Sequence, residues 1–182
     1  MISANENYIS ELNNLNDDEK LRHAETLDSL DALIASNIMF GNPAGSEQEM
    51  TEAAQIAQAV EFIDTKPERY KSPISQGGAN VSGGQKQRLS IARAIAKHPD
   101  VYIFDDSFSA LDYKTDTVLR SALKEKTTDS VVLIVAQRIS TILHAEQIIV
   151  LDDGKIVGKG THEELLKTCD AYYQIAASQL SE

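Results

Sequence analysis

The sequence predicts an α/β fold in which helices precede a small parallel sheet and a C-terminal hairpin. Two short β-branched runs, Val101–Asp105 and Val131–Ala136, flank a helical stretch at 113–126, which is the spacing of a strand–helix–strand crossover. Further along the chain, Asp153-Gly154 lies between two apolar runs and indicates a tight hairpin turn. Ahead of these strands, apolar residues recur at helical spacing.

Residues 1–33 are acidic and contain neither glycine nor proline. Asn16 with Glu19 matches a capping box, and Leu27 and Leu30 share one helical face. These features predict two short amphipathic helices. No pattern in this segment carries recognisable chemistry, so we assign it as a packing or tail segment of unknown role.

Residues 34–98 are predicted to form a helical subdomain. Asn42-Pro43-Ala44-Gly45 is a turn signal, and apolar residues at helical spacing predict a helix over 47–63. The stretch from Lys66 to Gly78 is predicted to be a loop. A second helix is expected from Gly83 to Lys97, where a following His-Pro pair ends it.

Residues 99–182 are predicted to form the half of the chain that contains the sheet. The hairpin strands are expected at Gln147–Leu151 and Lys155–Gly158, on either side of the Asp-Gly turn. Thr161-His162-Glu163-Glu164 is a capping box that opens a closing helical segment. The expected architecture is an incomplete parallel sheet followed by an antiparallel hairpin and helices.

Composition limits the classes of function. The chain has 182 residues, of which 42% are hydrophobic, which is enough for one sizeable core. A net charge of −11 argues against nucleic acid or anionic lipid as a partner of the general surface. The single cysteine, Cys169, excludes an internal disulfide and fits a reducing compartment. The longest apolar run is far shorter than the roughly 20 residues of a membrane span, and no basic-then-apolar leader opens the chain. Any membrane contact is therefore expected through another polypeptide segment.

Asn80-Val81-Ser82-Gly83-Gly84-Gln85 is the most informative stretch for chemistry. Ser82 and Gln85 have the spacing of a capping box, which places Ser82 at the N-cap of the following helix. Gly83 and Gly84 let the backbone approach a ligand closely, and their amides form an anion site together with the helix dipole. On its own, the hexapeptide is equally compatible with a glycine hinge between a loop and a helix.

The flanking residues decide between these interpretations. "VSGGQKQRLSIARAIAKHPDVYIFDDSFSALD" resembles the signature helix, Walker B strand and D-loop of ATP-binding-cassette (ABC) proteins. "VVLIVAQRIS" resembles the switch strand of that family, "IIVLDDGKIVGKGTHEEL" its C-terminal hairpin and helix, and "ASNIMFGNP" the entry to its helical subdomain. The resemblance is collinear from about Ile34 to the C-terminus and is nearest to multidrug exporters. It implies a partial P-loop NTPase-type parallel sheet with a C-terminal antiparallel hairpin, plus an α-helical signature subdomain.

The resemblance implies ATP and Mg²⁺ as ligands. The Ser82–Gln85 turn would bind the γ-phosphate of an ATP held by a second cassette. Asp105 would orient Mg²⁺, and Asp112 would belong to the turn that faces the partner. Val81 replaces the more usual leucine, which is a mild apolar exchange.

Two residues depart from the family pattern at positions that it uses in catalysis. Asp106 stands where the family usually has a glutamate that polarises the attacking water. Aspartate is one methylene shorter, and a misplacement of about 1 Å can cost around 10²-fold in rate. Gln137 stands where a switch histidine normally contacts the γ-phosphate. An amide can donate a hydrogen bond there, but it cannot become cationic or shuttle a proton.

Both departures predict a degenerate site, as in one subunit of a heterodimeric exporter whose two composite sites hydrolyse ATP unequally. The alternative is that both substitutions are tolerated without consequence, because a repositioned aspartate can still act as a weak base.

A Walker A loop, Gly-x-x-x-x-Gly-Lys-Ser/Thr, is not found in the sequence. The nearest match runs from Gly154 to Gly160, but it has only three intervening residues, lacks the hydroxyl and lies in the hairpin. In the family this loop, the adenine-stacking aromatic residue and the glutamine loop would all precede Ile34. We therefore expect the isolated chain to be inactive and ATP hydrolysis to belong to an assembled complex.

The predicted function is that of the C-terminal part of an exporter's ATP-binding cassette. The expected partners are a second cassette, in a hetero- or homodimer, and transmembrane domains, at the cytoplasmic face of a bacterial cell membrane. One alternative is a truncated, non-catalytic fragment that acts as a binding module or is an inactive remnant. Another is a chromosome-maintenance or DNA-repair ATPase, which the missing heptad repeats and the acidic composition disfavour.

Overall fold

The computed structural model describes residues 32–180, so the capping box predicted at Asn16 and Glu19 lies outside the described residues. The chain divides into two units. Among the described residues, the helical unit contains 32–98 together with Asp112–Leu123. The sheet unit contains Pro99–Leu111 and 124–180.

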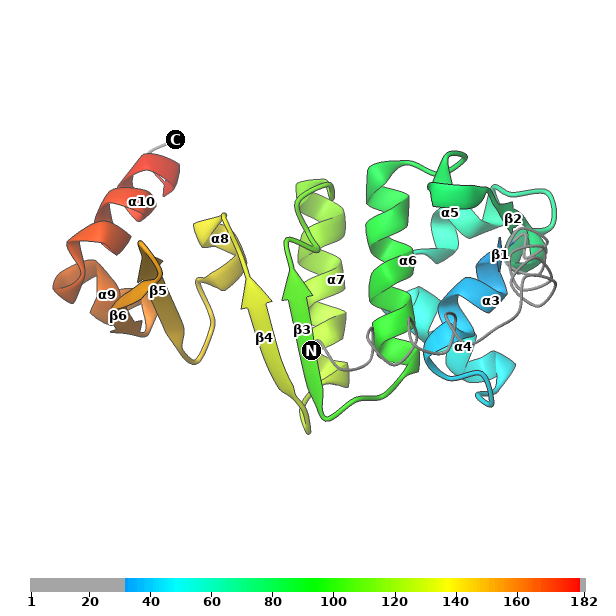
Figure 1. The fold of residues 1–182 in the computed structure, drawn as a ribbon, viewed down its shortest axis with the longest axis horizontal. Coiled ribbons are helices and arrows are strands. Elements are labelled where there is room, and N and C mark those ends of the chain that lie inside the picture. Colours follow the sequence, from blue (N-terminus) through cyan, green and yellow to red (C-terminus); the bar gives the residue numbers. More distant parts are fainter. Residues whose placement is uncertain (1–31, 181–182) are drawn as a thin grey trace, which may run out of the picture. The chain divides into compact units, whose positions relative to one another are not determined.

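In the helical unit, α6 packs against both α3 and α4 (Figure 1). The buried side chains between these helices are aliphatic and include Ile34, Ile38 and Ile95, each no more than 1% exposed. The elements of this unit are β1 (Ala32–Leu33), α3 (Ile34–Ile38), η1 (Met39–Gly41), α4 (Glu47–Ile56), α5 (Val60–Asp64), η2 (Arg69–Lys71), β2 (Pro73–Ile74), η3 (Gln76–Gly78), α6 (Gly83–Ala96) and α7 (Tyr113–Lys126). The last of these, α7, continues past Leu123 into the sheet unit.

The single helix predicted over 47–63 is wrong, because the structure has two helices, α4 and α5, with a break between them. Gln58 adopts a left-handed φ of 55°, which an α-helix does not accommodate. The amide of Ala59 donates to the carbonyl of Ala54 at 2.8 Å, so the last turn of α4 is closed at this point. Arg88 of α6 donates to the Gln58 carbonyl at 2.8 Å. A contact with a distant helix thus stabilises a break that the apolar periodicity did not reveal.

The stretch from Lys66 to Gly78 is more ordered than the predicted loop. Its strand β2 pairs antiparallel with β1, with Leu33 opposite Pro73, and the amide of Ile34 donates to the carbonyl of Ser72 at 3.1 Å. The partner strand lies far earlier in the chain, so no local pattern could have predicted the pair.

In the sheet unit the predicted parallel pair is confirmed. β3 and β4 run side by side in one direction (Figure 1), with Val101 opposite Val131 and Asp105 opposite Val135. The predicted hairpin is also confirmed as an antiparallel pair with an irregularity between Val150 and Leu151. The elements of this unit are β3 (Val101–Asp105), β4 (Val131–Val135), α8 (Ile139–Ile142), β5 (Ile148–Asp152), β6 (Lys155–Gly160), α9 (His162–Thr168) and α10 (Asp170–Leu180).

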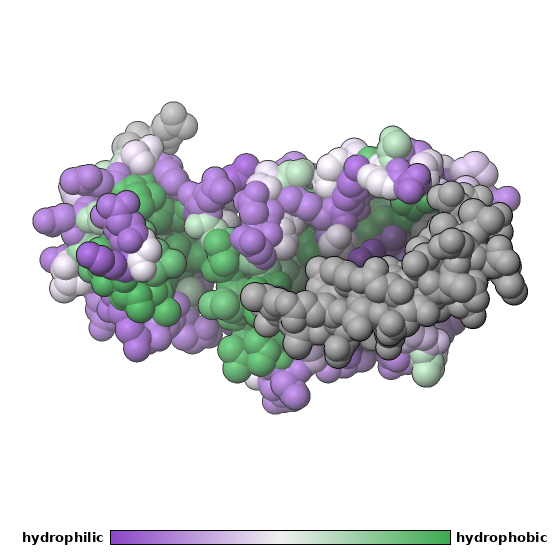
Figure 2. Space-filling model, viewed as in Figure 1, coloured by the Kyte–Doolittle hydropathy of each residue, from purple (hydrophilic) through white to green (hydrophobic). Residues whose placement is uncertain are grey.

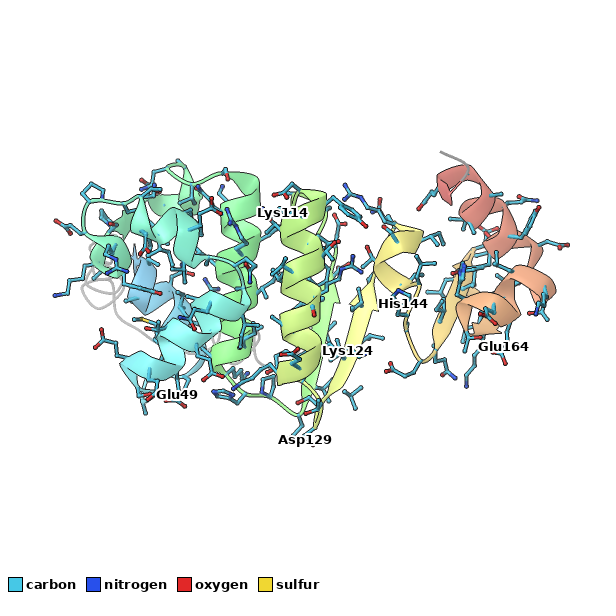
Figure 3. The ribbon with its side chains drawn as sticks, turned by 180° about the vertical axis from the view of Figure 1, so that it is seen from behind. Glu49, Lys114, Lys124, Asp129, His144 and Glu164 are labelled. Carbon is cyan, nitrogen blue, oxygen red and sulfur yellow. The ribbon has the colours of Figure 1, made fainter. Side chains whose placement is uncertain are left out.

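A C-terminal core joins the hairpin to the two last helices (Figure 1). Ile148 and Val150 of β5 contribute one side, and the helices contribute Leu165, Tyr172 and Ala176, all at most 7% exposed. The capping box predicted at Thr161 is confirmed, and its Glu164 lies at the start of α9 (Figure 3). The closing helical segment is two helices, because α9 ends at Thr168 and the next residue has an extended backbone.

Apolar side chains remain exposed on the parallel pair, where Figure 2 shows a hydrophobic area on the visible face. On β3 the exposure alternates: Tyr102 and Phe104 are buried, whereas Val101 and Ile103 are 52% and 55% exposed. On β4 the exposure is nearly continuous, and Val131 is 64% exposed. Within residues 32–180, β4 has β3 as its one hydrogen-bonded neighbour.

Candidate functional site

The N-terminus of α6 is closed by a complete capping box. Ser82 Oγ accepts from the Gln85 amide at 3.3 Å, and Gln85 Oε1 accepts from the Ser82 amide at 3.0 Å. The first intrahelical bond runs from the Lys86 amide to the Ser82 carbonyl at 2.9 Å. The predicted position of Ser82 at the N-cap is therefore confirmed. Because Gln85 is used in the cap, its side-chain oxygen is directed at the chain's own backbone.

Gly83 and Gly84 form the first turn of this helix. First-turn amides have no intrahelical acceptor, and the helix dipole places partial positive charge at them. Gly83 is exposed and Gly84 is half-buried. The hydroxyl of Ser82 accepts in the cap and retains its proton for donation. The turn therefore offers two amides and one hydroxyl to an anion.

The carboxyl end of β3 holds the two adjacent carboxylates. Asp105 is the last residue of the strand, and its side chain is exposed. Asp106 has a left-handed φ of 48°, a conformation that is uncommon for a residue with a side chain. Its amide donates to the Val135 carbonyl of the neighbouring strand at 3.3 Å, and its carbonyl accepts from Ser109 Oγ at 3.1 Å. These bonds hold the turn that redirects the chain directly after the strand.

Gln137 lies two residues beyond the end of β4. Because carboxyl ends of neighbouring parallel strands share one edge, Gln137 and the two carboxylates lie at the same edge of the sheet. The Gln137 carbonyl accepts from Gln179 Nε2 at 2.9 Å, and Gln179 Oε1 accepts from the Ile139 amide at 2.8 Å. Gln179 thus fixes the backbone on both sides of residue 138. Sequence reasoning missed this residue because nothing in the local pattern of α10 distinguishes it.

Asp112 precedes α7 and is used in its N-terminal turn. Its carboxylate accepts from the Thr115 amide at 3.0 Å and from the Thr115 hydroxyl at 2.7 Å. These two bonds, the amide first, lower the pKa of the Asp112 carboxyl below its usual value of 3.8. The carboxylate therefore has a helix-capping role in addition to any contact with a partner.

The structure distributes the predicted site residues between the two units. The helical unit holds Ser82–Gln85 and Asp112, and the sheet unit holds Asp105, Asp106 and Gln137. Among residues 32–180, no three His, Cys, Asp or Glu side chains gather into a metal cage. Asp105 offers one exposed carboxylate. This fits Mg²⁺, which typically takes one or two carboxylates and completes its shell with water and phosphate oxygens.

Comparison with known proteins decides the family. The family model described as "ABC transporter" matches residues 2–109, which is more than half of the chain. The chain belongs to the ABC transporter family. The match begins at residue 2, ahead of Ile34, where the motif resemblance begins.

Curated relatives of the chain include ABC transporter proteins, one of which is named as a multidrug exporter. The chain is 46% identical over 149 residues to an uncharacterized ABC transporter ATP-binding protein of Mycobacterium bovis, covering 80% of this chain and 25% of the relative. It is 41% identical over 146 residues to a putative multidrug export ATP-binding/permease protein of Staphylococcus aureus, with the same coverage. The chain thus spans about a quarter of the length of these curated relatives.

A solved structure gives the same result for the fold. A bacterial Atm1-family ABC exporter with ATP bound matches with a TM-score of 0.78 and 33% identity, over 82% of this chain and 26% of that chain. The predicted ATP-binding cassette of an ABC transporter, with its partial P-loop NTPase-type sheet, is therefore confirmed. Within residues 32–180, no helix has the length and hydropathy that crossing a membrane requires.

Proposed function

We propose that this chain is the C-terminal part of an exporter cassette and acts mainly in trans, on ATP held by a second cassette. The observation that carries the proposal is the capped N-terminus of α6, where Ser82, Gly83 and Gly84 present donors from a turn closed by its own side chains. Donors fixed in advance toward the place where charge develops are worth more than donors that must reorganise.

The proposed ligands are ATP and Mg²⁺. The N-terminus of α6 would bind the γ-phosphate oxygens of the partner's ATP. Asp105 would hold the metal of the chain's own half-site, at the end of β3. Bound Mg²⁺ would neutralise charge on the phosphate oxygens as the terminal phosphoryl group is transferred to water. Asp106 would orient and deprotonate that water, and Gln137 would donate to the γ-phosphate.

The chain's own acidic edge is proposed to be the weaker half of the pair. The Asp106 carboxylate is short for a base at this position, and the backbone of Asp106 is already committed to the turn by the Val135 and Ser109 contacts. An amide at Gln137 can donate but cannot take up a proton. The partner cassette would supply the Walker A loop and the stronger base, and membrane spans would come from outside this chain, at the cytoplasmic face of a bacterial membrane.

The test is ATP turnover by this chain mixed with an intact cassette that carries a Walker A loop and a glutamate base. Losing one preorganised donor typically lowers the rate about 10²–10³-fold. Gly84→Asp should lower the rate by more than this, because the aspartate side chain adds bulk and places a negative charge against the phosphate. The matched control is Asp106→Glu combined with Gln137→His, which should leave turnover at the partner's ATP unchanged.

Two results would count against the proposal. The first is turnover that Gly84→Asp leaves unchanged and that Asp106→Glu combined with Gln137→His raises tenfold. This result would indicate that ATP is hydrolysed at the chain's own site. Co-purification with the intact cassette without any change in turnover would favour the non-catalytic binding module instead.

A further inference from the structure

The loop that leads into α6 is fastened by one side-chain amide. Asn80 Oδ1 accepts from the Ser75 amide at 3.0 Å, and Asn80 Nδ2 donates to the Pro73 carbonyl at 2.8 Å. A carboxamide offers an acceptor and a donor from one planar group, so it can bind both backbone groups at once. Asn80, two residues before the N-cap, is thereby tied back to β2.

The anchor to which Asn80 is tied is itself held by the core of the helical unit. Pro73 pairs with Leu33 of β1, and the carbonyl of Ser72 accepts from the Ile34 amide at 3.1 Å. The next residue, Ile74, is 8% exposed. The bond of Asn80 to the Pro73 carbonyl therefore connects the start of α6 to a paired strand in which Pro73 is exposed and the neighbouring Ile74 is buried.

Two lysines hold the same loop from other sides. Lys86 of α6 donates from Nζ to the Gly77 carbonyl at 2.8 Å, and Lys66 donates to the Asn80 carbonyl at 3.3 Å. Gly78 has a φ of 69°, and a Cβ there would lie 2.7 Å from Lys86 Cε. The lysine stem thus lies close to a backbone position whose left-handed φ disfavours most residues with a side chain.

We propose that Asn80 is a positioning residue that sets the direction of the first-turn amides of α6. The chain path through residues 80–82 determines where the amides of Gly83 and Gly84 point, and a displacement of about 1 Å can cost around 10²-fold in rate. The identity of the anion as a γ-phosphate rests on the proposed function, whereas the positioning rests on the contacts of Asn80 itself.

Substitutions at Asn80 separate its two bonds. Asn80→Ala removes both. Asn80→Asp keeps an acceptor for the Ser75 amide but sets a carboxylate oxygen against the Pro73 carbonyl, where the donor is lost. Gln48→Ala is the matched control, because it removes an exposed carboxamide from α4 in the same unit.

Amide hydrogen exchange of the whole chain, without nucleotide or partner, measures directly how well the hydrogen bonds of this loop are kept. Ser75 donates to Asn80, Gly78 donates to the Ser75 carbonyl at 2.7 Å, and Val81 donates to the Gly78 carbonyl at 3.2 Å. Asn80→Ala should raise exchange at these three amides about tenfold. Asn80→Asp should keep Ser75 within about twofold of the unsubstituted chain, and Gln48→Ala should change none of them.

Turnover with an intact partner cassette gives the second readout. Asn80→Ala should lower the maximal rate about 10–100-fold while the chain concentration at half-saturation stays unchanged, because the surface is present but its donors are misdirected. If the unsubstituted chain fails to alter turnover, the proposed function fails, and the exchange result still decides whether Asn80 orders the loop. Exchange that is unchanged in Asn80→Ala, or that rises equally at Ala57, the C-cap residue of α4, would overturn the positioning role.

Discussion

At the scale of single residues, the carboxylate of Asp112 is held by two donors from Thr115, the backbone amide and the hydroxyl. Because the folded pKa is lowered from 3.8, this contact stabilises the fold above that pH and is lost as the pH falls through the folded value. Thr115→Val should raise the pKa of Asp112 partway toward 3.8, since the amide bond remains. Carboxyl chemical shifts followed by NMR across an acid titration would measure it.

Thr117→Val is the control for that titration. Thr117 lies on the same helix, and its hydroxyl donates to the Tyr113 carbonyl instead of to a carboxylate. An equal shift of the Asp112 pKa in both variants would contradict the assignment of the hydroxyl as a cause.

A second residue-scale prediction concerns the ion pair of Asp116 and Arg120 on α7. Two nitrogens of Arg120 donate to the two carboxylate oxygens at 3.0 and 2.6 Å, and the side chains are only 12% and 23% exposed. Asp116→Ala leaves a largely buried guanidinium without this partner, so the free energy of unfolding should fall by about 1.5–3 kcal/mol. Urea unfolding followed by circular dichroism would measure the change.

The comparison for this pair is Asp64→Ala. Arg69 binds Asp64 at 2.6 Å, but these side chains are 62% and 47% exposed. Solvent screens such a pair, so its loss should cost less than about 1 kcal/mol. Equal losses of stability from Asp116→Ala and Asp64→Ala would show that burial does not determine how much each ion pair contributes to the free energy of unfolding.

At the scale of elements, Gly158 determines how closely β6 approaches α9. A Cβ at this glycine would lie 2.7 Å from Cys169 Sγ and 3.0 Å from Leu165 Cδ2. Gly158→Ala should lower the stability of the C-terminal core by about 1–3 kcal/mol, because a packed core resists added volume. Adding Cys169→Ala should restore part of the loss, since it removes the sulfur that is met first. Thermal unfolding of the single and double variants would measure both effects.

Gly154→Asn serves as the control in the same hairpin. Gly154 has a φ of 73° with no atom within 4 Å of a Cβ, and asparagine tolerates this backbone conformation better than other residues do. A loss as large as that of Gly158→Ala would indicate that hairpin conformation, and not contact with α9, limits stability.

At the scale of the whole molecule, the parallel pair leaves apolar side chains uncovered within the described chain. Val131 and Leu133 on β4 are 64% and 51% exposed. A β-branched edge without charge or proline favours association between chains. Leu133→Lys should therefore raise the monomeric fraction severalfold in sedimentation velocity. Val118→Lys, at an exposed apolar position of α7, is the control and should have little effect.

The elements that the sequence predicted well are those whose signals are local. The capping boxes of Ser82 and Thr161 and the Asp-Gly hairpin follow from residues within a few positions of one another. The 113–126 helix and the two strands around it follow from periodicity. The candidate site residues were predicted in the same way, from the glycine turn and the acidic strand end, and they stay a prediction. The family was predicted from motif order and is confirmed. Each of these features is encoded in one short stretch.

Only the tertiary structure decided the features that depend on residues far apart in the chain. The break at Gln58 is stabilised by Arg88, and the β1–β2 pair joins segments with no shared pattern. The side chain of Asn80 donates to a carbonyl seven residues away, and Gln179 of the last helix donates to the carbonyl of Gln137. The physical reason is that a hydrogen bond depends on distance in space, whereas periodicity and capping signals report distance along the chain.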